Sequence, residues 1–207
     1  QGVLHPTLAK AAALSRQVNA FFSLWLPWFC EYGRNSAGQA RYRNTYTVFA
    51  GGDDFFLIGP WESTIELAGV LRERFAEYVV NKGITFSAGL TMTKSKMPVR
   101  HLAQRAEDAL DAAKARPAKD AVHIWGHSVA WDDWRALMDE RRTALETLMA
   151  RTESMGASFS TGLVYALLQL SDRTESSRPE DALWRSQLHY RLARFFHDRA
   201  RGGREAE

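Results

Sequence analysis

The feature that most constrains the fold of this chain is the tetrapeptide Gly-Gly-Asp-Asp at 51–54, which separates two short apolar stretches, 46–50 and 55–58. Glycine adopts positive φ at no steric cost, so two in succession allow a tight reversal between two strands. Two adjacent carboxylates at the tip repel each other, and a divalent cation removes that repulsion. Magnesium prefers one or two carboxylates together with substrate phosphates. Because Gly and Asp are also ordinary turn residues, these four residues alone leave a plain structural hairpin equally open.

The first 126 residues alternate helical and strand patterns around this turn. Val18, Asn19 and Phe22 belong to a three- and four-residue periodicity that predicts a helix over 6–30. The other elements expected in this half are strands over 42–50 and 55–58, a helix over 61–78, a strand over 84–93, a helix over 99–115 and a strand over 121–125. With one strand added in front, the core of this order is βαββαβ. It predicts an α+β, ferredoxin-like palm of antiparallel strand pairs with helices on one face.

The pattern changes after Gly126. Helical periodicity without any strand pattern predicts helices over 132–152, 158–170 and 178–201. We therefore expect two domains, a palm domain over 1–126 and a small all-α helical domain over 127–207.

Composition narrows the class of protein. The chain has 207 residues, of which 45% are hydrophobic and 25% charged, values typical of a soluble globular protein. Cys30 is the single cysteine, which excludes a disulfide framework and favours a reducing, cytoplasmic setting. The apolar run 21–30 contains Pro27 and is too short to span a bilayer, so we expect no membrane partner. The net charge of +3 suits a polyanionic partner, although scattered surface lysines and arginines give the same value.

The start of the sequence suggests a piece of a larger protein. The first residue is Gln1 rather than Met, and the first helical pattern begins within a few residues, with no strand before it. We therefore expect the leading strand of the palm to lie upstream of this chain.

Several motifs resemble one known family. The run from Tyr46 to Trp61, Tyr-Thr-Val-Phe-Ala-Gly-Gly-Asp-Asp-Phe-Phe-Leu-Ile-Gly-Pro-Trp, is similar to the palm polymerase motif in the large subunit of type III CRISPR effector complexes, and the III-A (Csm) branch fits best. The resemblance continues upstream over 13–22 and downstream over 86–90, 97–99 and 103–114. The segment 158–168 resembles the start of the family's C-terminal helical domain.

Diguanylate cyclases of the GGDEF class share the palm scaffold, including a pattern near 106–114. They carry Glu-Glu or Asp-Glu where this chain has Asp53-Asp54, and the helical domain is foreign to them. Both differences favour the CRISPR family.

The resemblance implies that the chain takes part in converting ATP to cyclic oligoadenylates when the complex holds a foreign target RNA. Asp53 and Asp54 are then the catalytic acids and the ligands of two Mg²⁺ (or Mn²⁺) ions, which serve nucleotidyl transfer. Gly51 and Gly52 let the backbone approach the bound nucleotide.

Two further residues are candidates for nucleotide binding. Ser87 lies on a strand expected to pair beside the motif, where it contacts phosphate or ribose or simply belongs to a run of small residues that permits close packing. Lys114 ends the helix over 99–115 and, by similarity to the cyclases, reaches the triphosphate; a lysine there also suits the helix dipole. The cyclases carry Gly-Arg-Asn after their lysine, whereas this chain has Arg116-Pro-Ala-Lys, a departure from their phosphate loop.

The resemblance also implies partners, namely the other subunits of a CRISPR ribonucleoprotein, guide RNA, target RNA, and small helical subunits against the helical domain. Family members hold a pair of ATP molecules between two palms and carry an HD single-strand DNase domain. We therefore expect a first palm and the HD domain upstream, and we expect 1–207 alone to be inactive. Two alternatives stay open, a catalytically silent subunit that caps the guide-RNA filament and senses the target, and a GTP-using diguanylate cyclase.

Overall fold

The chain forms two compact units, Gln1–Ala136 and Leu137–Glu207. The computed structural model describes residues 8–35, 38–79, 83–154, 160–174 and 178–202. The division falls after Ala136 rather than after Gly126, where the sequence analysis placed it, because a further strand and a short helix beyond Gly126 pack within the first unit.

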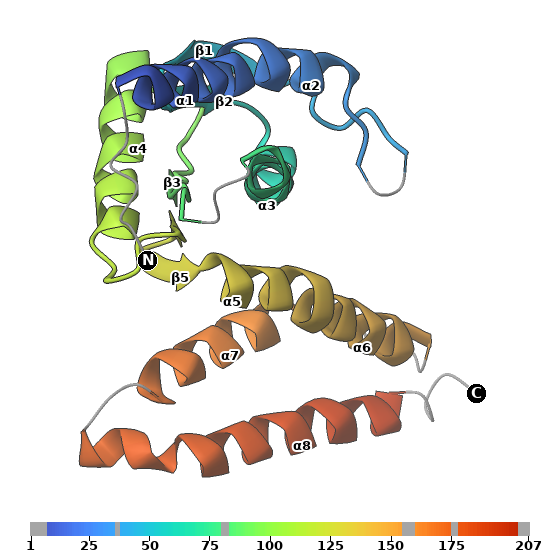
Figure 1. Cartoon of the computed structure of the whole chain (residues 1–207). Helices are drawn as coiled ribbons and strands as arrows, with labels where there is room; N and C mark the ends of the chain where they lie inside the picture. Colours follow the sequence, from blue (N-terminus) through green and yellow to red (C-terminus); the bar gives the residue numbers. More distant parts are fainter. Residues whose placement is uncertain (1–7, 36–37, 80–82, 155–159, 175–177, 203–207) are drawn as a thin grey trace. The chain divides into compact units, whose positions relative to one another are not determined.

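One long helical segment opens the first unit. It consists of α1 (Leu8–Ala20), the π-helical turn η1 (Phe21–Trp25) and α2 (Leu26–Tyr32), which follow one another as a single blue helix in Figure 1. This confirms the helix predicted over 6–30, apart from residues 6 and 7, which lie outside the described ranges. The π-helical turn widens the helix locally, and turns of this kind are frequent at functional sites.

The predicted hairpin is present. Strand β1 (Tyr46–Gly51) pairs antiparallel with β2 (Asp54–Ile58), and Gly51 lies opposite Asp54 across the reversal. The register shifts between Thr47 and Phe49, as in a β-bulge. The strand starts later than the predicted residue 42, because a turn in which the Thr45 N–H donates to the Tyr42 carbonyl precedes it.

A second sheet has the order β3-β4-β5, formed by Ala88–Gly89, Ala121–Ile124 and His127–Ala130. The helix α4 (Val99–Lys114) connects β3 to β4, and these two strands are parallel, as a helical crossover requires. The predicted strand over 84–93 is thus reduced to two residues. The prediction of antiparallel pairs is confirmed for β1–β2 and is wrong for β3–β4.

Strand β5 (His127–Ala130) was not predicted from the sequence. Trp125 and Gly126 form a two-residue reversal between β4 and β5, with φ of +52° and +84°. Positive φ at both central positions is the geometry of a tight hairpin turn, but tryptophan is not a residue that signals it. Gly126 therefore marks a hairpin within the first unit and not the end of it.

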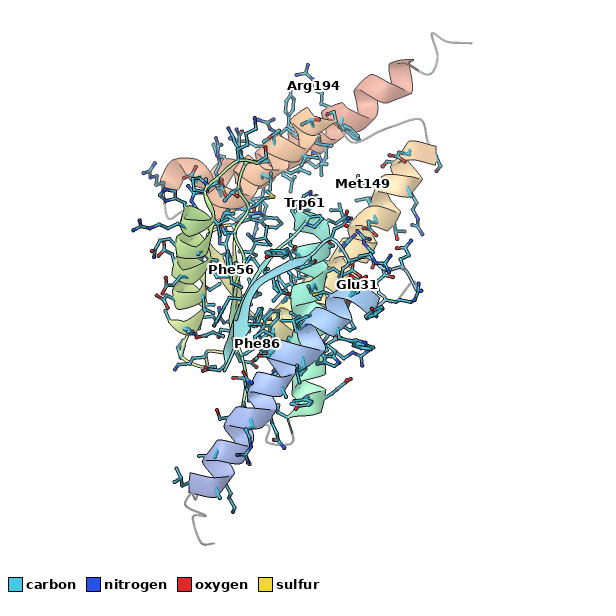
Figure 2. The ribbon with its side chains drawn as sticks, turned by 90° about the horizontal axis from the view of Figure 1, so that it is seen from above. Glu31, Phe56, Trp61, Phe86, Met149 and Arg194 are labelled. Atoms are coloured by element: carbon cyan, nitrogen blue, oxygen red, sulfur yellow. The ribbon has the colours of Figure 1, made fainter. Side chains whose placement is uncertain are left out.

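Aromatic rings form the core of the first unit. The helix α3 (Trp61–Tyr78) supplies Phe75, and the Phe22 ring stacks on both Phe75 and Phe55, with centroids 5.5 Å and 4.8 Å apart. Phe86 adds an edge contact to Phe75. Figure 2 shows the side chains of the chain as sticks, with Phe86 labelled. Because Phe55 directly follows Asp54, the core holds one side of the acidic turn.

The regular elements described in the second unit are all helical, as predicted. It contains η2 (Leu137–Arg141), α6 (Arg142–Ser154), α7 (Thr161–Thr174), η3 (Pro179–Leu183) and α8 (Trp184–Gly202). The predicted helix over 132–152 begins in α5 (Trp131–Ala136), which belongs to the first unit. Residues 158 and 159, where the next helix was expected to start, lie outside the described ranges. None of the helices described combines the length and the apolar composition that crossing a bilayer requires.

Candidate functional site

The two acids of the Gly-Gly-Asp-Asp turn lie on its exposed side. Asp53 is the second of the two residues in the reversal, Asp54 is the first residue of β2, and both are exposed. None of the ion pairs in the described part of the chain involves either carboxylate. Within the described residues, no Lys, Arg or His side chain therefore neutralises these two negative charges by an ion pair.

The backbone of the turn borders open space. Gly52 has a φ of +66°, the left-handed conformation that favours glycine, and a Cβ built there meets no atom within 4 Å. A Cβ on Gly51 would approach only the Phe49 ring, at 3.4 Å. Gly52 is thus needed for its conformation, and the space beside it leaves room for a ligand to approach the main chain.

Two polar side chains from the first helical segment hold this turn. Asn19 Oδ1 accepts a hydrogen bond from the Gly52 N–H at 2.8 Å. The Ser23 hydroxyl lies 3.1 Å from the same oxygen and 3.2 Å from the Ala50 carbonyl, so its single proton can be donated to either acceptor. The sequence analysis counted Asn19 in the helical periodicity and assigned it no role at the site. The signal that could have found it is an amide within an otherwise mainly apolar stripe.

Ser87 lies next to a different sheet from the one that carries the acids. It directly precedes β3, which pairs with β4 and not with the hairpin, so the expected pairing beside the motif is absent from the described strands. The segment still comes near the hairpin, because the Phe86 and Phe55 rings are in edge contact at 6.2 Å. The alternative, that Ser87 belongs to a run of small residues that permits close packing, has support at Gly89. A Cβ on Gly89 would lie 2.5 Å from the Ala106 carbonyl oxygen of α4.

Lys114 is exposed at the end of α4. This helix packs against β3, β4 and β5, and no interaction within the described ranges joins Lys114 to the acidic turn. The hydrogen bonds of the described residues join Asn19 and Ser23 to the turn, and none of those described joins Lys114 to it.

The donor set at the turn fits a metal ion that is shared with a substrate. Among the residues described, no group of three or more His, Cys, Asp or Glu side chains is placed to hold a metal. A cation at Asp53 and Asp54 would thus need oxygen ligands from water, the main chain or a nucleotide. Mg²⁺ and Mn²⁺ accept hard oxygen ligands of this kind, and Mg²⁺ commonly retains several waters.

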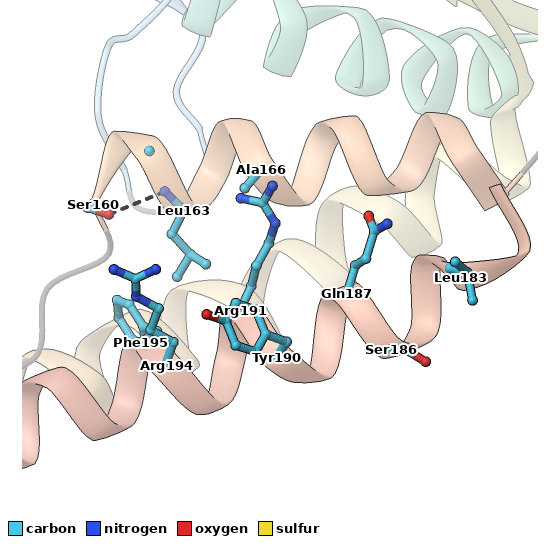
Figure 3. A pocket seen from close by; sticks show the side chains of 11 residues that line it. Ser160, Leu163, Ala166, Leu183, Ser186, Gln187, Tyr190, Arg191, Arg194 and Phe195 are labelled. Atoms are coloured by element: carbon cyan, nitrogen blue, oxygen red, sulfur yellow. Dashed lines mark hydrogen bonds between the residues drawn. The ribbon is translucent and has the colours of Figure 1, made fainter. Parts of the chain in front are cut away.

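A pocket of about 720 Å³ lies within the second unit. Figure 3 shows it between α7 and α8, with Leu163 on one helix and Tyr190 and Arg191 on the other. The Ser160 hydroxyl accepts a hydrogen bond from the Leu163 N–H at its edge. The described residues that line it include no carboxylate, so they do not offer the chemistry of the acidic turn.

Comparison with known proteins identifies the first unit. Residues 2–123 match the family model for the second palm domain of Cas10/Cmr2. A protein from Mycobacterium tuberculosis is 30% identical over 179 residues, 83% of this chain and 22% of that protein, and one from Enterococcus italicus is 32% identical over 192 residues, 91% of this chain and 22% of that protein. A third, from Streptococcus thermophilus, is 25% identical over 193 residues, 92% of this chain and 23% of that protein.

All three relatives are named CRISPR system single-strand-specific deoxyribonuclease Cas10/Csm1, subtype III-A. The chain spans 22–23% of the length of these curated relatives. The matches confirm the resemblance to the large subunit of type III-A complexes. Since the family model covers more than half of its residues, the chain belongs to the Cas10/Cmr2 family and carries the second palm domain.

Proposed function

We propose that this chain is the part of a type III-A CRISPR large subunit that synthesises cyclic oligoadenylate from ATP when target RNA is bound. The observation that carries the proposal is the pair Asp53 and Asp54, which is exposed on an open glycine turn and has no cationic partner among the described residues. In the reaction, a ribose 3′-oxygen forms a bond to the α-phosphorus of ATP, the bond to pyrophosphate breaks, and the hydroxyl proton passes to solvent.

The residues of the turn have distinct roles in this proposal. Asp53 and Asp54 hold Mg²⁺ or Mn²⁺, and Gly51 and Gly52 let the main chain approach the nucleotide. The metal, when bound, lowers the pKa of the attacking hydroxyl and neutralises charge on the leaving oxygens. Positioning and electrostatics supply most of the rate in phosphoryl chemistry, so no separate general base is needed from the chain.

Ser87 and Lys114 remain candidates for contacts to ribose or phosphate. Phe86 anchors the segment of Ser87 against the hairpin, which supports a contact from its neighbour. Lys114 is exposed and carries a cation that a triphosphate attracts. Both are proposed here as binding residues and not as metal ligands.

The finer fold proposal is a ferredoxin-like palm completed by a leading strand. In the described strands, β2 and β3 each pair on one side, so each offers an unpaired edge. A strand from a preceding segment, placed between them, would join β1-β2 and β3-β4-β5 into one sheet. Unpaired edges are costly to leave open, which supports such a strand.

The remaining proposals concern the whole protein. The name of the relatives supports a single-strand deoxyribonuclease activity of the whole protein. We assign this activity to an HD domain outside this chain, and we expect a first palm there to complete the ATP site. The proposed partners are guide RNA, target RNA and the other subunits, in the cytoplasm. Exposed apolar side chains on α7, among them Tyr165 and Leu168, support contacts of the second unit with small helical subunits.

The deciding experiment uses the complete complex with target RNA, Mg²⁺ and ATP, and analyses the products by mass spectrometry. We expect cyclic oligoadenylates from the wild type and none from an Asp53→Ala/Asp54→Ala variant that assembles normally. Product that is undiminished in the variant, or absent from the wild type, would favour the alternative of a catalytically silent subunit. A parallel reaction with GTP tests the diguanylate cyclase alternative.

A further inference from the structure

We infer that Asn19 and Ser23 are positioning residues that set the geometry of the Asp53–Asp54 pair for cation binding. The inference rests on the proposed function of this turn. It concerns two side chains that come from a helix far from the turn in sequence, and neither of them needs to touch the metal or the nucleotide.

The glycine turn is flexible by itself. Gly51 and Gly52 lack the side chains that restrict backbone motion, so the peptide between them is free to rotate unless something holds it. No packing contact does so at Gly52, because a Cβ placed there would meet nothing within 4 Å. The hydrogen bond from the Gly52 N–H to Asn19 Oδ1, at 2.8 Å, fixes the orientation of that peptide.

The first helical segment contacts the hairpin on both sides of Gly51. Asn19 holds the Gly52 N–H, while the Ser23 hydroxyl lies within hydrogen-bond distance of both Asn19 Oδ1 and the Ala50 carbonyl. The last residues of β1 and the reversal are thereby attached to one helix. We call these two side chains, Asn19 and Ser23, the turn clip.

The helix that carries the turn clip contains a π-helical turn. Ser23 lies in the π-helical turn η1, and Phe21 and Phe22 of the same turn are buried, at 2% and 1% exposure. The segment therefore faces the core with its rings while Ser23 reaches the hairpin. A helix fixed by its aromatic face makes a rigid support for the polar clip.

The consequence concerns the two carboxylates. Asp53 directly follows the held peptide, and Asp54 pairs with Gly51 across the reversal. Without the clip, a cation would have to order the glycine turn as it binds, and this ordering lowers affinity. Hydrogen bonds from neighbouring residues that orient the ligands of a metal typically change metal affinity or activity by roughly 10- to 100-fold.

The test measures Mn²⁺ binding by electron paramagnetic resonance in the full-length protein assembled in its complex. The signal that is lost in Asp53→Ala/Asp54→Ala defines the binding at the pair. We expect Asn19→Ala to weaken this binding roughly tenfold or more, and Ser23→Ala to weaken it less, because the bond to Gly52 survives. Asn19→Asp keeps an acceptor oxygen and should restore the binding.

The matched control is Gln17→Ala. Gln17 is an exposed amide on the same helix, and its recorded contact is through its main-chain carbonyl, which accepts from the Tyr78 hydroxyl and survives the substitution. We expect this variant to bind Mn²⁺ as the wild type does. In product formation, Asn19→Ala should raise the half-saturating Mg²⁺ concentration, and saturating Mg²⁺ should recover most of the rate.

Two results would overturn the inference. One is Asn19→Ala with a lower melting temperature but unchanged Mn²⁺ affinity, which would make the clip a structural anchor only. The other is an equal loss of affinity in Gln17→Ala. Failure of the proposed function is separate and shows as undiminished product from the variant that lacks both acids.

Discussion

Gly89 is the position where the structure makes the sharpest prediction about stability. It lies in β3 directly beneath α4, and a Cβ added there would overlap the backbone N of Leu110, lie 2.5 Å from the Ala106 carbonyl oxygen and lie 2.7 Å from the carbonyl carbon of Ala109. These atoms belong to the main chain of one helix, so no side-chain rotation can relieve the contacts. Gly89→Ala must therefore push α4 away from the sheet.

The size of the effect follows from the kind of contact. Overpacking a tight site costs about 1–3 kcal/mol, and a clash with helix backbone belongs at the upper end of that range. A loss of about 3 kcal/mol corresponds to a fall of roughly 6–12 °C in melting temperature for a chain of this size. The matched control is Gly69→Ala in α3, whose Cβ would meet only Trp134, at 3.5 Å. This variant should gain about 0.5–1 kcal/mol, because alanine favours the helix.

The assay is thermal unfolding of the two variants and the wild type, followed by circular dichroism. Gly89→Ala and Gly69→Ala make the same chemical change, so they differ only in what the new methyl group meets. Equal melting temperatures for the two variants would refute the close approach of α4 to β3. A stable Gly89→Ala protein would also remove the packing explanation for the small residues beside Ser87.

The remaining predictions concern Cys30 and Gly52. Burial raises the pKa of the Cys30 thiol to about 11 from its usual value of 9.0, so the thiol should resist alkylation near neutral pH until the chain unfolds, as mass spectrometry can record. Rapid labelling of the folded protein at neutral pH would contradict this protection. The neutral thiol also stabilises the fold below pH 9, and this contribution should be lost as the pH rises toward 11. Gly52→Ala should cost about 1–2 kcal/mol in urea denaturation from its positive φ alone, and Gly52→Asn, which tolerates that conformation, should cost less; equal stabilities of all three proteins would argue against the turn geometry.

The parts of the fold that were predictable from sequence are those with strong local signals. The glycine pair fixed the position of the hairpin, and the helical periodicities around Phe22 and Phe75 placed the two helices that carry the core. The acidic turn at Asp53 and Asp54 could be located for the same reason, because the residues that form it are immediate neighbours in the chain. Elements of this kind need no knowledge of distant contacts.

The parts that were missed depend on contacts between distant segments. Strand β5 follows a reversal at Trp125 and Gly126, and its strand character comes from pairing with β4 rather than from its own composition. The strand predicted over 84–93 pairs only at Ala88 and Gly89, where it meets β4 in the described structure. Pairing partners decide where such strands begin and end, and periodicity alone does not identify those partners.

The acidic turn combines both kinds of information. The sequence of the turn supplies the charges, but two residues that flank the acids are held by distant segments. Gly52 is bonded to Asn19 of the first helix, and Phe55 stacks on Phe22 of the same helix at 4.8 Å. One helical segment therefore contacts the chain on both sides of Asp53 and Asp54, with a hydrogen bond before them and an aromatic contact after them. A turn held in this way can keep two like charges close together without a bound cation, because contacts that do not depend on a cation offset their repulsion.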